Sequence, residues 1–316
     1  MIKPPFKAIS IVLVIALFFI ALPIVFSQER IENLLEKLRT APEIEQSNIL
    51  NQLSEINSEN ASDKAIQYAE SALILSRKYK DKRNEAFALQ NLCLGYLYND
   101  IYDKALVNGL AALDIFEELK KPKDLAYILS TLGWVYYDIQ NADLALKYHQ
   151  KVLTIYLELE EKDNIAFAYN SLGLVYSMKE EYEQALTFYL KSLKLGEENK
   201  LKHREAAACS NLGMTYASLE SYDLALSYLQ KALDLIGKNG TLLSKAEAWN
   251  QKGKVYLKTK QFIESEKCLK KARELITKST SNANKEKLMD NYEYSSELFF
   301  AKGDFKKAYE AVKEYT

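Results

Sequence analysis

The feature that most constrains this chain is a repeat of forty residues, which holds for five successive copies without a slipped residue. One column of the repeat holds Tyr96, Tyr136, Tyr176, Tyr216 and Tyr256. A second column holds Ala86, Ala126, Ala166, Ala206 and Ala246, and a third holds Cys93, Gly133, Gly173, Gly213 and Gly253. A fixed period of this length predicts one supersecondary unit copied along the chain, with a core that only stacking closes.

Each copy has the pattern of a hairpin of two helices. Apolar residues from Ala86 to Tyr98 keep helical spacing, as do those from Tyr102 to Leu113, and the polar stretch 99–101 predicts a turn between them. The whole chain has only 10 Gly and 5 Pro, which favours long helices. Glycine inside a helix costs about 1 kcal/mol relative to alanine, so the glycine column predicts a close approach of two backbones. The second helix supplies a matching small-residue column: Ala105, Ala145, Ala185, Ala225 and Ser265.

The residues Leu132, Gly133, Tyr136, Ala145 and Val152 resemble the tetratricopeptide signature, and later copies repeat the pattern. The period of 40 residues departs from the family's usual value of about 34 and resembles a subclass with extended helices. HEAT and armadillo repeats, with periods of about 40–47 residues, are the rival interpretation, and the Leu-Gly-x-x-Tyr pattern speaks against them. The resemblance implies an all-α fold, a right-handed α-solenoid of about seven stacked helical hairpins.

Three segments are expected along the chain. Residues 1–27 form a targeting segment, residues 28–45 an N-terminal capping helix and residues 46–316 the solenoid. The repeats are expected at about 46–85, 86–125, 126–165, 166–205, 206–245, 246–285 and 286–316. The last is expected to be clipped, because the sequence stops inside its second helix.

The N-terminal segment has the composition of an export signal. Lys3 and Lys7 precede a run of 19 residues, from Ala8 to Phe26, in which Ser10 is the one polar side chain. A cleavage site before Gln28 makes it a signal peptide. An uncleaved membrane anchor is the alternative, because roughly 20 apolar residues span a bilayer. Both interpretations predict an exported protein, periplasmic or otherwise extracytoplasmic.

The sequence shows no arrangement of side chains suited to catalysis or metal binding. His149 and His203 stand apart from acidic residues or cysteines at metal-ligand spacing, and no phosphate-binding loop or nucleophile motif occurs. Cys93, Cys209 and Cys268 fit small buried hydrophobic residues. A formal net charge of −1 without a basic cluster argues against nucleic acid as a partner. We therefore predict a protein that is not an enzyme and has no cofactor or metal.

In the resembled family the first helices line a concave groove that binds peptides. Counting from the glycine column, the side chains expected there are mostly aromatic or amide-bearing. They are Phe87, Asn91, Tyr98, Tyr127, Trp134, Tyr137, Phe167, Asn170, Met178, Asn211, Met214, Asn250 and Lys254. An exposed aromatic patch usually marks a partner surface, and amides can bracket a peptide backbone. The alternative for any one aromatic residue is packing against the neighbouring repeat.

These features predict an exported scaffold that holds an apolar or aromatic peptide or helix of a partner protein. A membrane contact is expected only through an uncleaved N-terminus, and the uncapped C-terminal end offers a surface for self-association. The alternative function is a sensory input module, because residues 301–309 resemble the exported sensor regions of bacterial membrane-bound histidine kinases and regulators. Its output domain would be absent or separate.

Overall fold

The structure is a computed structural model that describes residues 29–58, 62–237, 240–279 and 284–315, without the side chains of 284–286 and 315. Within these ranges all regular secondary structure is helical, which confirms the predicted all-α fold of stacked hairpins. The predicted targeting segment, residues 1–27, lies outside the described residues. The chain divides into two compact units, Met1–Ile115 (unit 1) and Phe116–Thr316 (unit 2).

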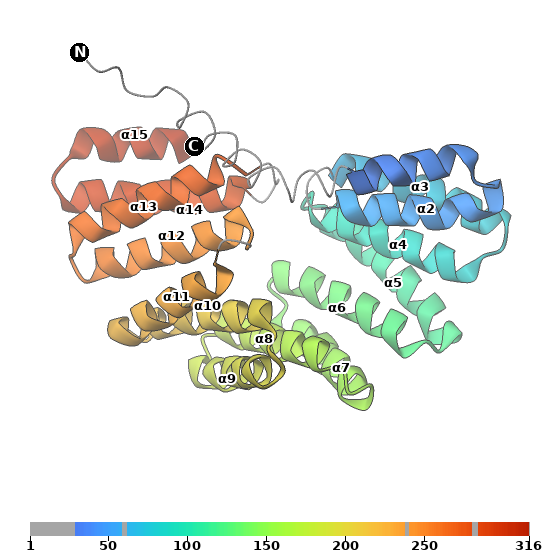
Figure 1. Cartoon of the computed structure of the whole chain (residues 1–316), viewed down its shortest axis with the longest axis horizontal. Coiled ribbons are helices and arrows are strands. Elements are labelled where there is room, and N and C mark those ends of the chain that lie inside the picture. The colour runs from blue at the N-terminus through green and yellow to red at the C-terminus, as the bar shows by residue number, and fades with distance from the viewer. Residues whose placement is uncertain (1–28, 59–61, 238–239, 280–283, 316) are drawn as a thin grey trace, which may run out of the picture. The chain divides into compact units, whose positions relative to one another are not determined.

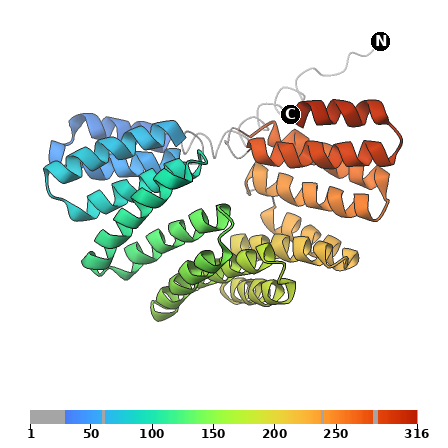
Figure 2. The same cartoon turned by 180° about the vertical axis from the view of Figure 1, so that it is seen from behind.

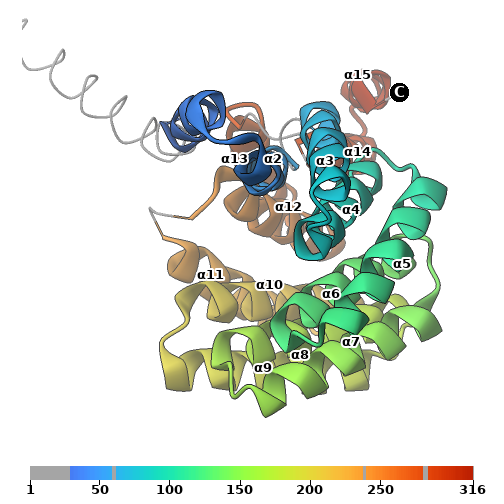
Figure 3. The same ribbon diagram turned by 90° about the vertical axis from the view of Figure 1, so that its right-hand side faces the viewer.

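Unit 1 begins with a helix at residues 29–40, within the segment expected to cap the array. Its remaining helices are α2 (Glu43–Asn57), α3 (Ser62–Lys78), α4 (Lys82–Leu97) and α5 (Tyr102–Leu119), the last of which continues into unit 2. Helices α2, α3 and α4 pack against one another (Figure 3).

Unit 2 is a stack of helical hairpins (Figures 1 and 2). Its helices are α6 (Pro122–Asp138), α7 (Ala142–Glu158), α8 (Lys162–Met178), α9 (Tyr182–Asn199), α10 (Lys202–Ser218), α11 (Tyr222–Ile236), α12 (Leu242–Lys258), α13 (Phe262–Ile276), α14 (Asn284–Ala301) and α15 (Phe305–Tyr315). Each even-numbered helix is the first helix of a hairpin and packs on the odd-numbered second helix that follows. Each of the second helices α7, α9, α11 and α13 also packs on the first helix of the next hairpin, so the hairpins share one core.

The helices end by a turn that recurs every twenty residues. Asn141 donates its backbone N–H to the carbonyl of Tyr136 at 2.8 Å, and Glu181 does the same to Tyr176 at 2.9 Å. This bond closes a Schellman-type cap, which needs a residue in the left-handed region just before the donor. Charged or amide residues take that place with φ between 49° and 61°: Lys80, Asp100, Lys120, Gln140, Glu160, Glu180, Lys200, Glu220 and Lys260. The forty-residue period is therefore two half-repeats of one helix and one turn.

The glycine column serves a different purpose from the one expected. A Cβ built on Gly133 would lie 2.7 Å from the imidazole of His149, and one on Gly173 would lie 2.5 Å from the ring of Tyr189. In the next two hairpins Leu229 and Leu269 take the same place, against Gly213 and Gly253. Each glycine thus makes room mainly for a side chain of the second helix, rather than for a second backbone.

The tyrosine column closes the other side of each hairpin. Tyr136 stacks on Tyr148 with ring centroids 5.3 Å apart, and Tyr216 stacks on Tyr228 at 5.5 Å. Tyr176 and Phe188 make the equivalent pair in α8 and α9. These rings lie nearly parallel, at 8–10°, and offset stacking of this kind adds to the area they bury.

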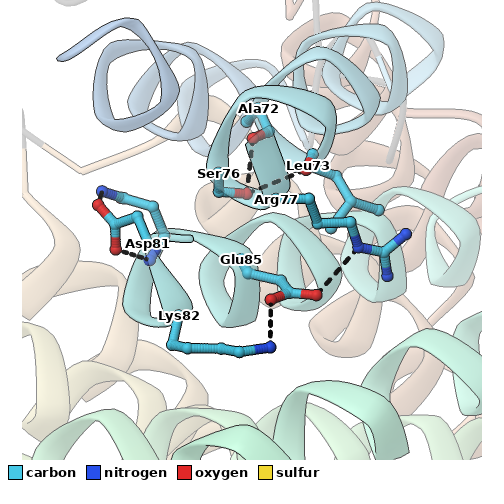
Figure 4. A network of polar contacts seen from close by, with 8 residues as sticks. Ala72, Leu73, Ser76, Arg77, Asp81, Lys82 and Glu85 are labelled. Atoms are coloured by element: carbon cyan, nitrogen blue, oxygen red, sulfur yellow. Dashed lines mark hydrogen bonds and ion pairs between the residues drawn. The ribbon is translucent and has the colours of Figure 1, made fainter. Parts of the chain in front are cut away.

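A buried carboxylate with two cationic partners lies where α4 meets the end of α3. In unit 1, Glu85 of α4 is buried beside the end of α3 and accepts hydrogen bonds from Arg77 and Lys82, each at 2.9 Å (Figure 4). Burial opposes ionisation of Glu85, but the hydrogen bonds from Lys82 and Arg77 hold the pKa of its carboxyl below the usual value. The small Ser76 of α3, which bonds back to its own helix, stands at this junction (Figure 4). A buried carboxylate is therefore tolerated at Glu85, because the neighbouring Ser76 is small and because Arg77 and Lys82 supply positive charge.

Candidate protein-interaction surface

The predicted groove residues fall on both units and are described for each in turn. In unit 1, Phe87 and Asn91 lie on α4, and Tyr98 directly follows it with 47% of its surface exposed. In unit 2 the predicted residues lie on four first helices. They are Tyr127, Trp134 and Tyr137 on α6, Phe167, Asn170 and Met178 on α8, Asn211 and Met214 on α10, and Asn250 and Lys254 on α12. We call this surface of unit 2 the first-helix face.

Trp134 is the centre of an aromatic cluster on the first-helix face. Its indole meets the ring of Tyr137 edge-on at 5.5 Å, and the ring of Phe167 across the hairpin boundary at 6.3 Å. All three side chains are partly exposed, and Tyr127 on the same helix is 36% exposed. Edge-to-face contacts are a favourable arrangement of aromatic rings and hold the three side chains against one another. The structure therefore brings together three of the aromatic residues predicted from the sequence, Trp134, Tyr137 and Phe167, while Tyr127 lies on the same helix as Trp134.

His149 forms the floor of this cluster. It lies on α7, is fully buried, and contacts the Trp134 ring at a centroid distance of 4.9 Å. Neither of its ring nitrogens has a hydrogen-bond partner among the described residues. Burial lowers the pKa of His149 from 6.5 to about 4, so the imidazole is neutral at pH 7. The cluster thus rests on an uncharged ring.

An arginine covers one side of the cluster. The guanidinium of Arg204, on α10, lies 5.1 Å from the centre of the Phe167 ring. Its Nε and Nη2 donate to the two carboxylate oxygens of Asp163 on α8, at 3.1 and 2.8 Å. His203 lies on the first turn of α10, with its Nε2 2.8 Å from a carboxylate oxygen of Asp163. In unit 1, Arg83 lies over the Phe87 ring at the same distance of 5.1 Å.

The asparagines mostly join the first helices to one another. Asn91 is 5% exposed and donates to the backbone carbonyl of Asn51 on α2 at 3.0 Å, and Asn250 is fully buried and accepts from Asn291 on α14 at 2.7 Å. On the partly exposed side, Asn211 donates to Asn170 at 2.9 Å. This differs from the expectation that these amides face a peptide. A buried amide without a partner is costly, so neighbouring helices satisfy one another.

The C-terminal part of the first-helix face is polar. The Nζ of Lys254 lies 4.9 Å from the centre of the Tyr294 ring on α14. Nearby, Glu247 of α12 pairs with Lys287 of α14 at 2.8 Å. These side chains are partly buried and engaged with the next helix, whereas Met178 and Met214 remain partly exposed apolar groups. The apolar part of the face therefore lies on α6, α8 and α10.

The described residues contain buried, protonated thiols and no metal-binding cluster. Burial raises the pKa of Cys93 to about 12 and those of Cys209 and Cys268 to about 11, so all three thiols stay protonated at neutral pH. Within the described ranges, no cluster of three or more His, Cys, Asp or Glu side chains is arranged to hold a metal ion. Over the same ranges, no helix is both long enough and apolar enough to cross a membrane.

Two features of the face were not predicted from the sequence. The arginine over each phenylalanine is one, and in unit 1 its signal was the spacing of Arg83 and Phe87, four residues apart on one helix. The amide bridges are the other. Their signal was an asparagine recurring at multiples of forty residues, at Asn51, Asn91, Asn211 and Asn291.

Comparison with known proteins identifies the repeats. Family models of the tetratricopeptide repeat match residues 124–198, 164–238 and 246–277, all within unit 2. These residues therefore carry tetratricopeptide repeats, and no catalytic family is indicated. No curated protein sequence is similar enough to count as a relative.

Solved structures with the same architecture are distant in sequence. Aspartyl phosphate phosphatase F from Bacillus subtilis has a TM-score of 0.64 and 16% identity, over 85% of this chain and 70% of its own. A signal transduction ATPase with a tetratricopeptide repeat sensor, from Pyrococcus horikoshii, has a TM-score of 0.61 and 17% identity, over 92% of this chain and 47% of its own. A Rap protein in complex with competence and sporulation factor has a TM-score of 0.58 and 12% identity, over 92% and 96%. At such identities the likeness establishes the fold.

Proposed function

We propose that this protein is an interaction scaffold that binds an apolar or aromatic segment of a partner protein through the aromatic cluster of α6 and α8. The observation that carries the proposal is the placement of Trp134, Tyr137 and Phe167. They lie on two neighbouring first helices, with contacting rings and partly exposed surfaces. Tryptophan and tyrosine in such clusters supply much of the binding energy at protein interfaces.

The charge around the cluster supports an apolar partner over an acidic tail. The guanidinium of Arg204 lies over the Phe167 ring, and Asp163 already holds two of its N–H groups. Lys254 lies over the Tyr294 ring, on α12, which begins the second hairpin after the one that contains α8. The complex between a Rap protein and competence and sporulation factor, which shares the fold, supports a protein or peptide partner.

A displayed library of random peptides tests this specificity, because it offers apolar, aromatic and acidic side chains to the protein at once. The body of the protein, from Gln28 onward, should enrich peptides rich in Trp, Phe and Leu. The double variant Trp134→Ala/Tyr137→Ala should lose this enrichment, with binding of a selected peptide weakened at least about tenfold. A matched control is Ile263→Ala, because Ile263 is 70% exposed on the second helix α13.

Two results would contradict the proposal. One is enrichment of peptides with acidic C-termini instead of aromatic ones. The other is unchanged peptide affinity in the double variant. Far-UV circular dichroism checks that both variants keep the helical content of the parent protein, because the altered rings are only partly buried.

The proposal includes export, for which Lys3, Lys7 and the apolar run from Ala8 to Phe26 are the support. Cell fractionation of the full chain, with detection at the C-terminus, tests it. We expect the protein outside the cytoplasm, either shortened before Gln28 or retained with the membrane. Replacement of Leu13 and Leu17 by arginine should keep it in the cytoplasm, whereas unchanged fractionation would contradict an export signal.

A sensory input module remains the second candidate, supported by the resemblance of residues 301–309 to exported sensor regions. A sensor would bind its ligand through the same surface as a scaffold, but the two candidates differ in what ligand binding causes. Ligand binding by a scaffold needs no output protein, whereas a sensor changes the activity of one. Measuring the activity of any kinase or regulator that is encoded beside it, in coexpression with and without the selected peptide, separates the two candidates.

A further inference from the structure

The hairpin of α12 and α13 differs in charge from all the others. From Leu242 to Ile276 it has nine lysine or arginine residues against four glutamates, a formal charge of +5. The five hairpins before it, each counted from the first residue of its first helix to the last residue of its second, have charges of −3, −3, −1, −2 and −1. The hairpin of α14 and α15 has a charge of −1. Positive charge concentrated in one hairpin favours an anionic partner there.

Exposed lysines line the outer side of α13. Its inner side is defined by five buried residues: Ser265, Cys268, Leu269, Ala272 and Ile276. Lys267, Lys270 and Lys271 lie on the other side of the helix and are exposed. Lys267 pairs with Glu264 at 2.7 Å, whereas Lys270 and Lys271 form no ion pair within the described ranges. With the flanking turns included, the exposed charged residues from 260 to 278 are five lysines and two glutamates.

An exposed isoleucine replaces an acid on this side. Every earlier second helix has an acid at one position of its first turn: Asp63, Asp103, Asp143, Glu183 and Asp223. The equivalent residue of α13 is Ile263, which is 70% exposed, while Glu264 supplies the acid that favours the start of a helix. An exposed apolar side chain beside lysines is typical of a face that lies on a membrane surface. We call Ile263, Lys267, Lys270 and Lys271 the outer face of α13.

A buried lysine adds positive charge to the same side. At its repeat position the earlier first helices have buried leucines: Leu92, Leu132, Leu172 and Leu212. Lys252 of α12 is 8% exposed, and its ammonium donates to the side-chain oxygen of Gln230 at 2.8 Å and lies 5.2 Å from the centre of the Trp249 ring. Within the described residues it has no carboxylate partner. Gln230 is exposed on α11 at the repeat position of Lys270, so the ammonium is directed to the outer side of the hairpins.

The kind of cation on the outer face of α13 favours a lipid surface over other anionic partners. Arginine is the better side chain for bidentate recognition of carboxylates and for nucleic acid. The one arginine of this hairpin, Arg273, is engaged with α14 instead, where it donates to Asn291 and Ser295, each at 2.9 Å. Lysine is a flexible point charge, which suits the diffuse charge of anionic lipid headgroups. Ile263 supports the same choice, because an aliphatic side chain adds nothing to an ion pair but can enter a bilayer interface.

We propose that the outer face of α13 rests on an anionic lipid bilayer, with Ile263 in the headgroup region and Lys267, Lys270 and Lys271 among the phosphates. The choice of lipid rests on the proposed export, because an exported chain meets a membrane. This contact is additional to the one expected from the N-terminus. The other hairpins of unit 2 are acidic and are repelled by the same surface, so the contact selects which hairpin meets the bilayer. The aromatic cluster on α6 and α8 stays open to a partner.

Cosedimentation with sucrose-loaded vesicles tests the proposal on purified protein, so its result does not depend on whether export occurs. The body from Gln28 onward, which contains every described helix, is mixed with vesicles of phosphatidylcholine or of an equal mixture of phosphatidylcholine and phosphatidylglycerol. Binding should require phosphatidylglycerol and should fall steeply as the salt concentration rises, because the exposed charges are screened. The single variant Ile263→Ser should weaken binding several-fold without changing its dependence on salt.

The main variant is Ile263→Asp/Lys267→Ser/Lys270→Gln, which installs the residues that α11 has at the same positions, Asp223, Ser227 and Gln230. The fold accepts these residues there, so thermal unfolding should shift little, whereas vesicle binding should weaken at least about tenfold. The matched control is Lys147→Ser/Lys151→Glu. It makes the same change of −3 in charge at exposed positions of α7 equivalent to Lys267 and Lys271, and should bind vesicles like the parent.

The two binding surfaces can be tested apart. Trp134→Ala/Tyr137→Ala should bind vesicles like the parent protein, and the α13 variant should bind the selected peptide like the parent. The proposal is overturned if vesicles without phosphatidylglycerol bind equally well, if the α13 variant keeps its binding, or if the α7 control loses as much. It is also overturned if the protein ignores the anionic vesicles and instead binds polyglutamate or duplex DNA through the same residues, since the occupant is then an acidic protein or a nucleic acid.

Discussion

Two pairs of neighbouring first helices in unit 2 are held together in opposite ways. Between α6 and α8 the contact is made by rings, with Trp134 and Phe167 6.3 Å apart and both partly exposed. Between α12 and α14 it is made by polar groups, with Asn250 and Asn291 fully buried and hydrogen-bonded at 2.7 Å. The buried asparagines hydrogen-bond to groups of the protein itself and are not available to a partner, because a buried amide must be satisfied. The aromatic contact leaves surface for a partner.

The difference has an energetic consequence that mutations can measure. Removing one member of a buried polar network leaves the others without partners, at about 1–3 kcal/mol for each group. Truncating a partly exposed ring loses only the area that it buries, at roughly 25 cal/mol per Å². The polar contact should therefore be the stability-critical one, and the aromatic contact the one that tolerates change in the free protein.

The largest expected effect is that of Asn291→Ala. The Asn291 amide donates to Asn250 and to the carbonyl of Leu269 at 2.8 Å, and its oxygen accepts from Arg273 at 2.9 Å. We expect a loss of about 3–4 kcal/mol in the free energy of unfolding, measured in urea, because several buried groups lose partners together. Hydrogen exchange should localise the loss to α12–α14.

Asn211→Ala is the matched control for this prediction. Its amide makes one hydrogen bond, to the partly exposed Asn170. A loss of about 1 kcal/mol is expected there. Equal losses in the two variants would show that burial of the amide bridge does not set its importance.

The next effect is a dependence of stability on pH that originates beneath the aromatic contact. Burial lowers the pKa of His149 to about 4 from 6.5, so between these values the unfolded chain binds a proton that the folded protein excludes. Stability should therefore fall as the pH is lowered from 6.5 to 4, by about 3 kcal/mol at most. The contribution is complete above pH 6.5 and the loss is complete below pH 4.

His149→Leu tests this directly, because leucine occupies the equivalent place at Leu229 and Leu269. The variant should lose this part of the pH dependence. It should also be more stable than the parent at pH 5, because the unpaired ring nitrogens are gone. A variant that loses stability at pH 5, or keeps the same slope between pH 4 and 6.5, would refute the assignment.

Sequence periodicity was enough to predict the fold and to place the aromatic cluster. The columns at Tyr136 and Gly133 recur because every hairpin makes the same internal contact, and such contacts are local in sequence. Trp134 and Phe167 could be placed on one face because helical spacing decides which side chains point the same way. The structure places the rings of Trp134, Tyr137 and Phe167 in contact, and their role in binding stays a prediction.

The fate of the asparagines could not be deduced from spacing alone. Asn91 and Asn211 occupy the same repeat position, yet one is buried and the other partly exposed. The outcome depends on how closely the preceding first helix approaches, and on whether it offers a polar group, as Asn51 of α2 does to Asn91. Similarly, glycine alone does not show whether a backbone or a ring such as His149 will fill the space.

A smaller difference in stability is expected when the glycines of the α6–α7 and α12–α13 hairpins, Gly133 and Gly253, are replaced by alanine. A Cβ at Gly133 meets three atoms of the rigid His149 ring at 2.7–3.0 Å, whereas one at Gly253 meets the flexible Leu269 side chain at 2.8 Å. We expect Gly133→Ala to cost about 2 kcal/mol of stability and Gly253→Ala about 1 kcal/mol. In a His149→Ala background the cost of Gly133→Ala should disappear, as measured by a double-mutant cycle. Persistence of that cost would show that the ring is not what Gly133 accommodates.

The smallest expected effect concerns the ion pair beside the rings, Asp163 with Arg204. Hydrogen bonding to Arg204, with the nearby charge, holds the pKa of Asp163 below its usual value of 3.8. Its stabilisation is therefore present above about pH 4 and is lost as the pH falls towards the lowered pKa, below the window of His149. The side chains are 40% and 22% exposed, so Asp163→Asn should cost only about 0.5–1 kcal/mol, and less in high salt. Urea titrations at low and high salt measure this. If the variant lost as much stability as Asn291→Ala, the aromatic side of unit 2 would be held by polar groups as firmly as α12 and α14. The distinction between the α6–α8 contact, which leaves surface for a partner, and the α12–α14 contact, which stabilises the fold, would then be wrong.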